Sequence, residues 1–325
     1  MIQLSNIVAT YTTVRGEVNA VDGLDLEFDG GRIIGIAGES GCGKTTLLRV
    51  LYGDLEYPLS LKRGTVRYGF SGRHGQEVTE RNIRKYWFRK ISYIPQSSMS
   101  SLNPVQRVRK QFVDFQGTRG RGEQERTLSN ARQYFRELGL PVEAMDAYPH
   151  QLSGGMRQRV MVALATLYHP EIILADEPTT ALDVVVQKGI LILLRDLQKT
   201  MRNTIFFVSH DMGVQYQIAH KMLIMYAAKA VEYGGSDAIF ESPLHPYTLM
   251  LIDSLPTVGD DSLREGVAGR PPSLWDDLHG CRFAPRCPQA MQKCVDEEPD
   301  LTEVRPGRFV ACHFPVRPEK RAGRQ

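Results

Sequence analysis

The sequence predicts an α/β protein with a phosphate-binding loop, antiparallel strands before it, a helical insertion after it and a small cysteine-rich segment at its end. Three observations predict this class. A glycine-rich loop follows a short β-branched run at 32–37 and precedes a helix-like run at 46–51. Two further apolar runs, at 172–175 and 204–208, end in polar residues, as buried parallel strands do. Four of the five cysteines lie in the last 45 residues.

The composition is that of an ordinary globular protein. The chain has 325 residues, 42% hydrophobic and 24% charged, which allows one large domain with an accessory part. The formal net charge of +3 is mild, and no aromatic residues interleave a basic patch, which argues against nucleic acid as a partner. Residues 1–6 lack the basic and apolar regions of a signal peptide, and no apolar run is long enough to span a membrane. We therefore expect a cytosolic protein, or one held at a membrane by its partners.

Strand-like patterns precede and follow the loop. Residues 2–36 alternate apolar and polar side chains between turns, which predicts antiparallel strands. Tyr11 lies on one of them, where an aromatic ring can stack on adenine, although a half-buried strand tyrosine is the simpler interpretation of this residue alone. Residues 64–70 and 91–94 are further strand-like runs, and the second leads to Gln96.

The loop fits the pattern G-x-x-x-x-G-K-[ST], with the sequence Gly38-Glu39-Ser40-Gly41-Cys42-Gly43-Lys44-Thr45-Thr46. Its glycines let the backbone curl so that successive N–H groups point at an anion. Lys44 can reach the β- and γ-phosphates as a mobile charge, and the hydroxyl of Thr45 is placed to ligate Mg²⁺. A helix that begins here adds its positive dipole end under the phosphates. We therefore predict a nucleoside triphosphate site, in which Cys42 is a small filler.

A second helix start also has the features of an anion site. A polar loop is expected at 97–104, and residues 105–170 are mostly helical in character. Within them Ser153 can cap a helix, while Gly154 and Gly155 leave the amides at its first turn bare. An ordinary capped helix start explains these three residues equally well when they are taken alone.

Polar residues stand at the ends of both later apolar runs. The run at 172–175 leads to Asp176 and Glu177, at the strand edge where parallel sheets bind ligands. There Asp176 would hold Mg²⁺ together with the loop threonine, and Glu177 would orient an attacking water. A helix is predicted over roughly 184–200. The next strand ends at His210, which we expect to meet the γ-phosphate.

The order and separations of these motifs resemble those of the nucleotide-binding subunit of an ATP-binding cassette (ABC) transporter, over residues 1 to about 235. The resemblance implies a P-loop NTPase fold, with a RecA-like core, an antiparallel β subdomain and a helical subdomain. On this basis the ATPase core with its β subdomain covers 1–96 and 166–255. The helical signature subdomain covers 97–165, and the cysteine-rich C-terminal module covers 256–325.

The resemblance also implies roles for single residues. Glu177 is the expected catalytic base, assisted by the Q-loop Gln96 and the switch histidine His210. Mg²⁺ would be held by Thr45, Gln96 and Asp176. The Ser-Gly-Gly signature binds ATP held by the other subunit, so two subunits enclose two nucleotides. The residues expected to contact ATP are Tyr11, Gly38, Ser40, Gly41, Cys42, Gly43, Lys44, Thr45, Thr46, Asp176, Ser153, Gly154, Gly155 and Asp183.

Three segments resemble the import ATPases for oligopeptides, dipeptides or nickel, namely 95–104, the signature with Met156, and 242–248. The resemblance implies an ATP-hydrolysing subunit that powers import of peptides or a related solute through dimer closure and opening. Its partners would be a second, non-identical ATPase subunit, two transmembrane permease subunits and an extracytoplasmic substrate-binding protein. The chain would lie peripherally at the cytoplasmic face of the membrane. The alternative function is a soluble ABC ATPase that acts on nucleic acid.

The C-terminal cysteines have the spacing C-x₅-C-x₆-C-x₁₇-C, formed by Cys281, Cys287, Cys294 and Cys312. In a reducing cytosol such a set favours a metal site over disulfides. Zinc tetrathiolate sites typically use tight C-x₂-C pairs, so the wider spacing favours a [4Fe–4S] cluster. The family resemblance implies the same cluster. Zinc is the alternative, and free thiols without a metal are the third possibility.

Overall fold

The structure is a computed structural model of the full chain, in which two compact units are distinguished. The first unit contains residues 1–84 and 207–325, and the second contains residues 85–206. Part of the polar loop expected at 97–104 lies outside the described residues. The described residues are 1–70, 78–96, 101–115, 117, 120–180, 182–255, 266–276 and 278–316.

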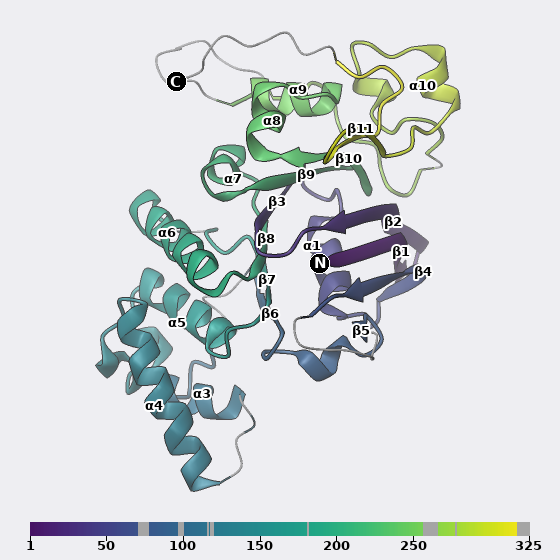
Figure 1. The fold of residues 1–325 in the computed structure, drawn as a ribbon. Helices are drawn as coiled ribbons and strands as arrows, with labels where there is room; N and C mark the ends of the chain where they lie inside the picture. Colours follow the sequence, from purple (N-terminus) through teal and green to yellow (C-terminus); the bar gives the residue numbers. More distant parts are fainter. Residues whose placement is uncertain are drawn as a thin grey trace. The chain divides into compact units, whose positions relative to one another are not determined.

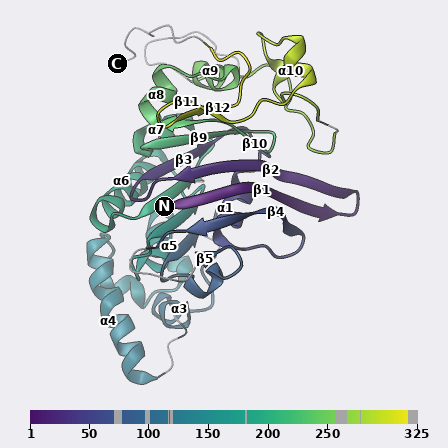
Figure 2. The same ribbon diagram turned by 45° about the vertical axis from the view of Figure 1, so that its right-hand side comes forward.

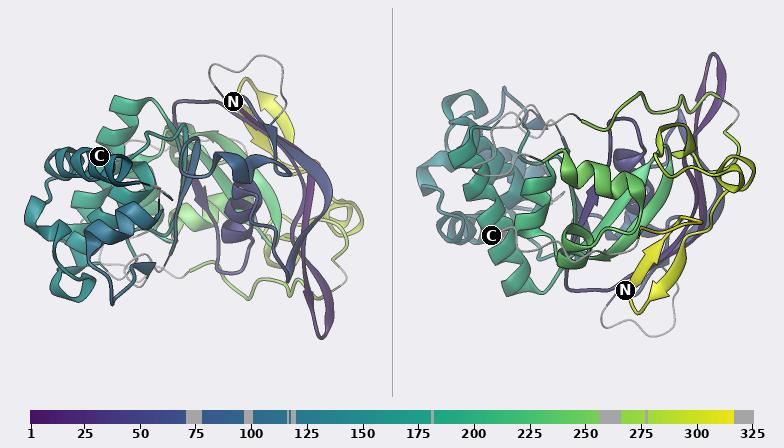
Figure 3. Two further views of the ribbon diagram at one scale, coloured as in Figure 1. Left: turned by 90° about the horizontal axis from the view of Figure 1, so that it is seen from below. Right: turned by 90° about the horizontal axis from the view of Figure 1, so that it is seen from above.

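The N-terminal part of the first unit is a four-stranded antiparallel sheet, as predicted (Figures 1 and 3). Its strands are β1 (Ile2–Thr13), β2 (Gly16–Phe28), β4 (Leu59–Tyr68) and β5 (Val78–Thr79), in the order β2-β1-β4-β5. Apolar and polar side chains alternate along β2, so one face is buried and the other is solvated. Strand β4 starts five residues before the strand-like run that the sequence indicates at 64–70.

A second set of strands in the same unit has the order β11-β12-β10-β9-β3. Strand β3 (Ile33–Ala37) is completely buried and pairs in parallel with β9 (Lys221–Tyr226). The remaining pairs are antiparallel and involve β10 (Lys229–Gly235), β12 (Arg308–Val310) and β11 (Thr302–Arg305). The burial of all five residues of β3 places the start of the glycine loop, at the carboxyl end of this strand, beside the core of the unit.

Short helices accompany these strands in the first unit. Helix α1 (Lys44–Tyr52) follows the glycine loop, and α7 (Met212–Ile218) packs on β3. Figure 2 shows α8 (Ser236–Glu241) and α9 (Pro246–Asp253) beyond the β9–β10 pair. Helix α10 (Gln292–Asp296) is a single turn near the C-terminus. Among the described residues, no helix is both long and apolar enough to cross a membrane.

The C-terminal segment is not confirmed as a separate small module. Strand β12 pairs with β10 of the first unit, so the segment extends the core strands. Phe283 is 1% exposed and packs edge-on against Tyr226, and it also contacts the ring of Tyr247. These residues belong to one buried cluster with β9 and α9. The segment therefore shares the hydrophobic core of the ATPase strands.

The second unit contains parallel strands and a helical region. Strand β6 (Ile91–Ile94) pairs in parallel with β7 (Ile172–Asp176), and β8 (Thr204–Val208) begins beside β7. All five residues of β7 are buried, as expected for a strand covered on both faces.

The segment expected to be mostly helical contains α3 (Val108–Phe115), α4 (Arg121–Glu137) and α5 (Gly154–Thr166), which pack on one another (Figure 1). Helix α6 (Val184–Met201) agrees with the predicted range of 184–200 to within one residue. One-turn 3₁₀ helices occur at Ile83–Tyr86, Val142–Met145, Pro149–Gln151 and Ala284–Arg286.

Candidate functional site

The loop between β3 and α1 has a backbone that only glycine allows at two positions. Gly38 has φ +148°, and a Cβ atom there would lie 2.1 Å from the carbonyl oxygen of Met225. Gly43 has φ +104°, and its Cβ would lie 2.0 Å from the carbonyl oxygen of Ala20. Any larger residue would therefore strain the backbone and displace a neighbouring strand. Gly41 also has a positive φ, but no atom lies within 4 Å of its Cβ position.

The side chain of Lys44 folds back onto the backbone of this loop. Its side chain is 7% exposed, and its ammonium donates hydrogen bonds to the carbonyl oxygens of Gly38 at 2.7 Å and Glu39 at 2.9 Å. Thr45 and Thr46 follow in the first turn of α1. The loop thus brings a cation and a helix N-terminus to one place, which is the arrangement that binds phosphate groups.

Two predicted ATP contacts, Cys42 and Tyr11, lie in the loop and beside the helix that follows it. Cys42 is 3% exposed, and burial raises the pKa of its thiol, so it is a neutral, space-filling side chain as predicted. The hydroxyl of half-buried Tyr11 accepts long hydrogen bonds from Thr46 and Arg49 of α1, both at 3.4 Å. These bonds fix the Tyr11 ring beside α1, while stacking of the ring on adenine stays a prediction.

In the second unit, Asp176 ends β7 as predicted and is 2% exposed. The hydroxyl of Tyr93, on the neighbouring strand β6, donates to its Oδ2 atom at 2.8 Å. A buried carboxylate is stabilised only when hydrogen-bond donors or a cation accompany it. Tyr93 is therefore part of the site, although sequence reasoning did not identify it. Its place on the strand adjacent to β7 is the signal that could have done so.

Glu177 follows in a left-handed backbone conformation, with φ +46°. Such a conformation costs about 1–3 kcal/mol for a non-glycine residue and persists where the surroundings fix it. Here two donors hold the Oε2 atom, namely the Gln96 amide at 3.1 Å and the Thr180 hydroxyl at 2.9 Å. The structure thus brings together two of the predicted catalytic side chains, Gln96 and Glu177. Thr180, three residues beyond Glu177, is a further contact that the sequence alone did not identify.

Two helix N-termini of the second unit meet near the signature. Ser153 caps α5 by accepting a hydrogen bond from the amide of Met156 at 3.2 Å, as predicted. Asp183 caps α6 by accepting from the amide of Val186 at 2.9 Å. A Cβ atom on Gly155 would lie 2.8 Å from a methyl group of Val186, so the glycine allows these two ends to pack closely. Gly154 is the first residue of α5 and is half-buried.

His210 is exposed and lies in the first unit, two residues beyond Val208, where β8 ends, so the strand ends two residues before the predicted position. The next residue, Asp211, caps α7 by accepting from the amides of Gly213 and Val214. The cap fixes the chain direction at His210. Lys44, Thr45 and His210 belong to the first unit, whereas Gln96, Asp176 and Glu177 belong to the second.

The expectation of a metal site at the cysteines is wrong. All four line one pocket of the first unit, but no group of three or more His, Cys, Asp or Glu side chains in the described ranges is arranged to hold a metal ion. This overturns both the [4Fe–4S] cluster and the zinc alternative. The physical reason is the apolar surroundings, since Pro246, Phe283 and Phe314 line the same pocket. Burial in this pocket raises the pKa of the Cys312 thiol to about 11 and raises those of Cys281 and Cys287. The four residues are Cys281, Cys287, Cys294 and Cys312.

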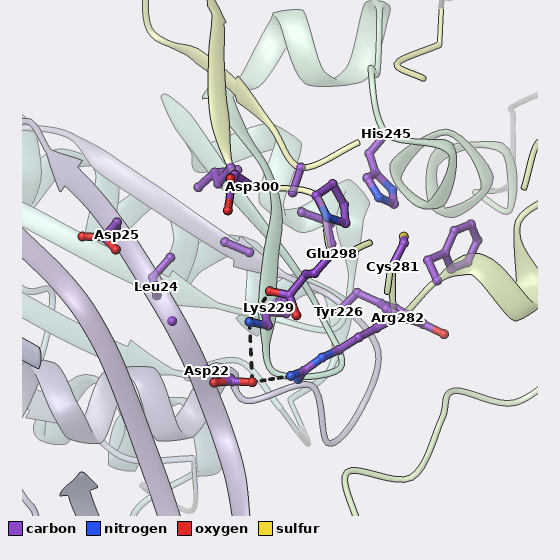
Figure 4. Close-up of a pocket in the computed structure, with 17 residues that line it drawn as sticks. Asp22, Leu24, Asp25, Tyr226, Lys229, His245, Cys281, Arg282, Glu298 and Asp300 are labelled. Carbon is purple, nitrogen blue, oxygen red and sulfur yellow. Dashed lines mark hydrogen bonds and ion pairs between the residues drawn. The ribbon is translucent and has the colours of Figure 1, made fainter. Parts of the chain in front are cut away.

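A second pocket of the first unit is charged (Figure 4). It has a volume of about 70 Å³. Asp22 forms ion pairs there with Arg282 and with Lys229, and Lys229 also pairs with Glu298 at 2.5 Å. Opposite charges compensate one another across this pocket, so the described side chains act as ties between the C-terminal segment and the core strands.

Comparison with known proteins agrees with these features. A family model described as ABC transporter matches residues 21–180, and one described as oligopeptide/dipeptide transporter, C-terminal region, matches residues 231–294. The chain is 37% identical to the dipeptide transport ATP-binding protein DppD of Caldanaerobacter subterraneus subsp. tengcongensis, over 97% of both chains. It is 36% identical to the oligopeptide transport ATP-binding protein OppD of Salmonella typhimurium, over 97% of this chain and 94% of the relative.

Solved structures agree as well. The dimeric structure of MJ0796, described as a bacterial ABC transporter cassette, is similar with a TM-score of 0.61 and 26% identity, over 73% of this chain and 99% of that chain. A post-hydrolysis state of the same cassette, bound to ADP and Pi, is similar with a TM-score of 0.58. The relatives are named as transport proteins, so they do not favour the alternative of an ATPase that acts on nucleic acid. The chain therefore has the P-loop ABC cassette fold, belongs to the ABC transporter family and is an ATPase of that family.

Proposed function

We propose that the chain is the ATP-hydrolysing subunit of an importer of peptides or a related solute. The observation that carries this proposal is the similarity to dipeptide and oligopeptide transport ATP-binding proteins over almost the whole chain, including the C-terminal part. ATP-dependent closure and opening of a dimer of ATPase subunits is the proposed output. The similarity to a dimeric cassette structure supports this dimer.

The phosphate loop is the proposed binding site for the triphosphate. Gly38, Gly41 and Gly43 allow its backbone N–H groups to converge, and Lys44 supplies positive charge. The remaining loop residues Ser40, Cys42 and Thr46 complete the cradle, and Tyr11 would stack on adenine. Thr45, Gln96 and Asp176 offer hard oxygen ligands, which are the donors that Mg²⁺ prefers. When bound, Mg²⁺ neutralises phosphate charge.

Glu177 is the proposed general base. Its carboxylate accepts hydrogen bonds from Gln96 and Thr180. These two side chains orient the carboxylate but are not bases, so Glu177 alone can accept the proton. A positioned carboxylate can accept a proton from water while that water attacks the γ-phosphate. Gln96 would report the state of this site to the membrane subunits, and His210 would contact the γ-phosphate.

The signature residues Ser153, Gly154 and Gly155 are proposed to bind ATP held by the second ATPase subunit, with Asp183 at the same interface. The packing of the α5 and α6 N-termini supports a shared role, because both ends carry an exposed capping side chain and meet at Gly155 and Val186. In functional terms, 1–96 with 166–255 would form the core, 97–165 the signature part and 256–325 the subfamily-specific part. These three functional regions are ranges of the sequence and do not coincide with the two compact units.

The remaining partners follow from the relatives. We propose two transmembrane permease subunits, an extracytoplasmic substrate-binding protein and a second, non-identical ATPase subunit. The chain would then act at the cytoplasmic face of the membrane as a peripheral subunit.

Transport by the assembled complex tests this function. Vesicles that contain both ATPase subunits and both permeases, with the binding protein outside and ATP at the ATPase face, should accumulate a labelled dipeptide or oligopeptide. The Glu177→Gln variant should assemble and bind ATP but should stop uptake. Uptake that continues at the wild-type rate with Glu177→Gln would contradict the proposed base. A complex that moves no peptide, while the chain binds DNA at physiological salt, would contradict the proposed transport function.

A further inference from the structure

Glu39, the second residue of the phosphate loop, is held at its amide, its carbonyl and its carboxylate. Its backbone N–H donates to the hydroxyl of Tyr247 at 2.9 Å. Its carbonyl oxygen accepts from the Lys44 ammonium at 2.9 Å. Its carboxylate receives the guanidinium of Arg286. Two of these three partners lie more than 200 residues further along the chain, yet all four residues belong to the first unit.

Every N–H group of the Arg286 guanidinium donates a hydrogen bond. Its Nη1 and Nη2 atoms donate to the two carboxylate oxygens of Glu39, at 2.7 and 2.9 Å. The other N–H groups donate to the carbonyl oxygens of Ala268 and Val267 and to the hydroxyl of Tyr226. The side chain is 5% exposed, and the hydrogen bond to Glu39 raises the pKa of the guanidinium. A two-point Arg–carboxylate pair fixes direction as well as distance, which a lysine cannot do.

Tyr247 is equally well fixed. It is 0% exposed, and its ring packs against Tyr226 and Phe283. Its backbone amide donates to Nδ1 of His245, which caps α9. The hydroxyl that meets Glu39 therefore stands on a side chain with little freedom to move. The sequence marked this segment only as a feature of the import subfamily.

We propose that Tyr247 and Arg286 are positioning residues for ATP, which hold the phosphate loop in its phosphate-binding curvature through Glu39. This inference rests on the proposed role of the loop in binding the triphosphate. A loop that is already curved binds phosphate without first ordering its own backbone. The same contacts also help to position Lys44, because its ammonium donates a hydrogen bond to the carbonyl oxygen of Glu39.

The test compares matched variants of the full chain. Isothermal titration with ATP in the presence of Mg²⁺ gives Kd, and steady-state hydrolysis gives KM and kcat. Tyr247→Phe keeps the buried ring and removes one hydroxyl, so Kd and KM should rise about fivefold. Arg286→Lys keeps the charge but loses the two-point hydrogen bonding to the Glu39 carboxylate, so Kd and KM should both rise about tenfold. In both variants kcat should change less than about twofold, because the interaction is made before and during the reaction alike.

Two controls separate this effect from general damage. Tyr233→Phe also removes one buried hydroxyl, which has no hydrogen-bond partner among the described residues. Arg282→Lys alters another arginine of the same segment, whose ion pair is with Asp22 and not with the loop (Figure 4). Both controls should keep Kd within about twofold of the wild type, as expected for sites that do not couple. In a Glu39→Gln background, Arg286→Lys should have little further effect.

The outcomes distinguish this inference from the proposed function. If Lys44→Ala abolishes ATP binding while Tyr247→Phe and Arg286→Lys bind as the wild type does, the positioning role is wrong and the binding loop stands. If Lys44→Ala binds ATP normally, the loop assignment itself fails. Equal loss of affinity in Arg282→Lys and Arg286→Lys would also overturn the inference, because docking of the segment in general would then be responsible. Variants that fail to fold are detected by their Tm without nucleotide, and Tyr247→Phe remains as the mildest change.

Discussion

The phosphate loop and the end of β7 both follow a fully buried strand, yet the sequence builds them by different means. After β3, the loop depends on its backbone, because Gly38 and Gly43 occupy positions that leave no space for a Cβ atom. After β7, the chain depends on side chains, since Asp176 is bonded by Tyr93 and Glu177 by two other donors.

The difference corresponds to the chemistry that each region is proposed to perform. Binding a phosphate needs many converging N–H groups, which the backbone supplies at low conformational cost once glycine allows the turn. Moving a proton needs one carboxylate in one orientation, which only a side-chain network can fix. Substitutions in the loop should therefore abolish binding, whereas substitutions at the strand end should change the rate.

The largest effect is expected from Gly43→Ala. The added methyl group would meet a carbonyl oxygen at 2.0 Å in a left-handed backbone conformation. We expect a loss of about 4 kcal/mol or more in the free energy of unfolding and no detectable ATP binding. Chemical denaturation and titration with ATP measure the two quantities. Gly41→Ala is the matched control and should cost only about 1 kcal/mol, because its Cβ position is open. Equal losses of unfolding free energy in Gly43→Ala and Gly41→Ala would contradict the view that the loop depends on glycine where no space is left for a Cβ atom.

The pH dependence of the unfolding free energy should reveal His245, the cap of the helix that carries Tyr247 to the phosphate loop. Burial lowers the pKa of His245 to about 3, so the folded state keeps this residue neutral, as its role as a cap requires. Below an unfolded pKa of about 6.5 only the unfolded chain takes up the proton, so stability falls by about 1.4 kcal/mol per pH unit. The loss should continue down to the folded pKa. Burial also raises the pKa of Glu232, which accepts from the His245 amide, so the comparison must isolate the histidine.

His245→Asn provides that isolation, because asparagine also caps helices but does not titrate. The difference in unfolding free energy between the wild type and His245→Asn should change by about 2 kcal/mol between pH 6.5 and pH 5. A difference that is constant with pH would contradict the account of a neutral, buried cap.

At the strand end, Tyr93→Phe should have a smaller effect. It removes the donor to the buried Oδ2 atom of Asp176, which should cost about 1–2 kcal/mol of stability. It should also raise the Mg²⁺ concentration that gives half-maximal hydrolysis. Tyr134→Phe is the control in the same unit, since its hydroxyl bonds Thr166 and not the strand end. An equal change in Mg²⁺ dependence in both variants would show that Tyr93 has no special role.

The smallest effect is expected from Thr180→Ala. Loss of its 2.9 Å hydrogen bond to Glu177 should lower kcat about fivefold and leave the Kd for ATP unchanged. Thr180→Ser should restore the rate, because it restores the hydroxyl. A rise in Kd without a change in kcat would place Thr180 on the binding side of the comparison.

Local features of the site could be predicted from the sequence. The spacing of the glycines predicts the loop, and the four apolar residues before Asp176 predict a buried strand. The helix predicted over roughly 184–200 is helix α6, and its cap, Asp183, is known only from the structure. Each of these features depends on neighbours within about one or two turns of the chain, which is the range that periodicity describes.

Contacts between distant segments could not be predicted in the same way. Arg286 and Glu39 are 247 residues apart, and Tyr93 and Asp176 are 83 residues apart. No periodic pattern links such positions, and only tertiary packing brings them together. The cysteines show the opposite error, since their spacing indicated a metal site, whereas no group of side chains in the described ranges is arranged to hold a metal ion. Spacing describes which residues are near in sequence, but packing decides how their side chains are arranged in space.

The central claim is that the loop binds ATP and the strand end hydrolyses it. The most direct measurement is ATP affinity and phosphate release in parallel for Lys44→Ala and Glu177→Gln. We expect Lys44→Ala to lose both, and Glu177→Gln to keep the wild-type Kd while phosphate release falls about 100-fold or more. Normal affinity in Lys44→Ala, or undiminished phosphate release in Glu177→Gln, would contradict the account.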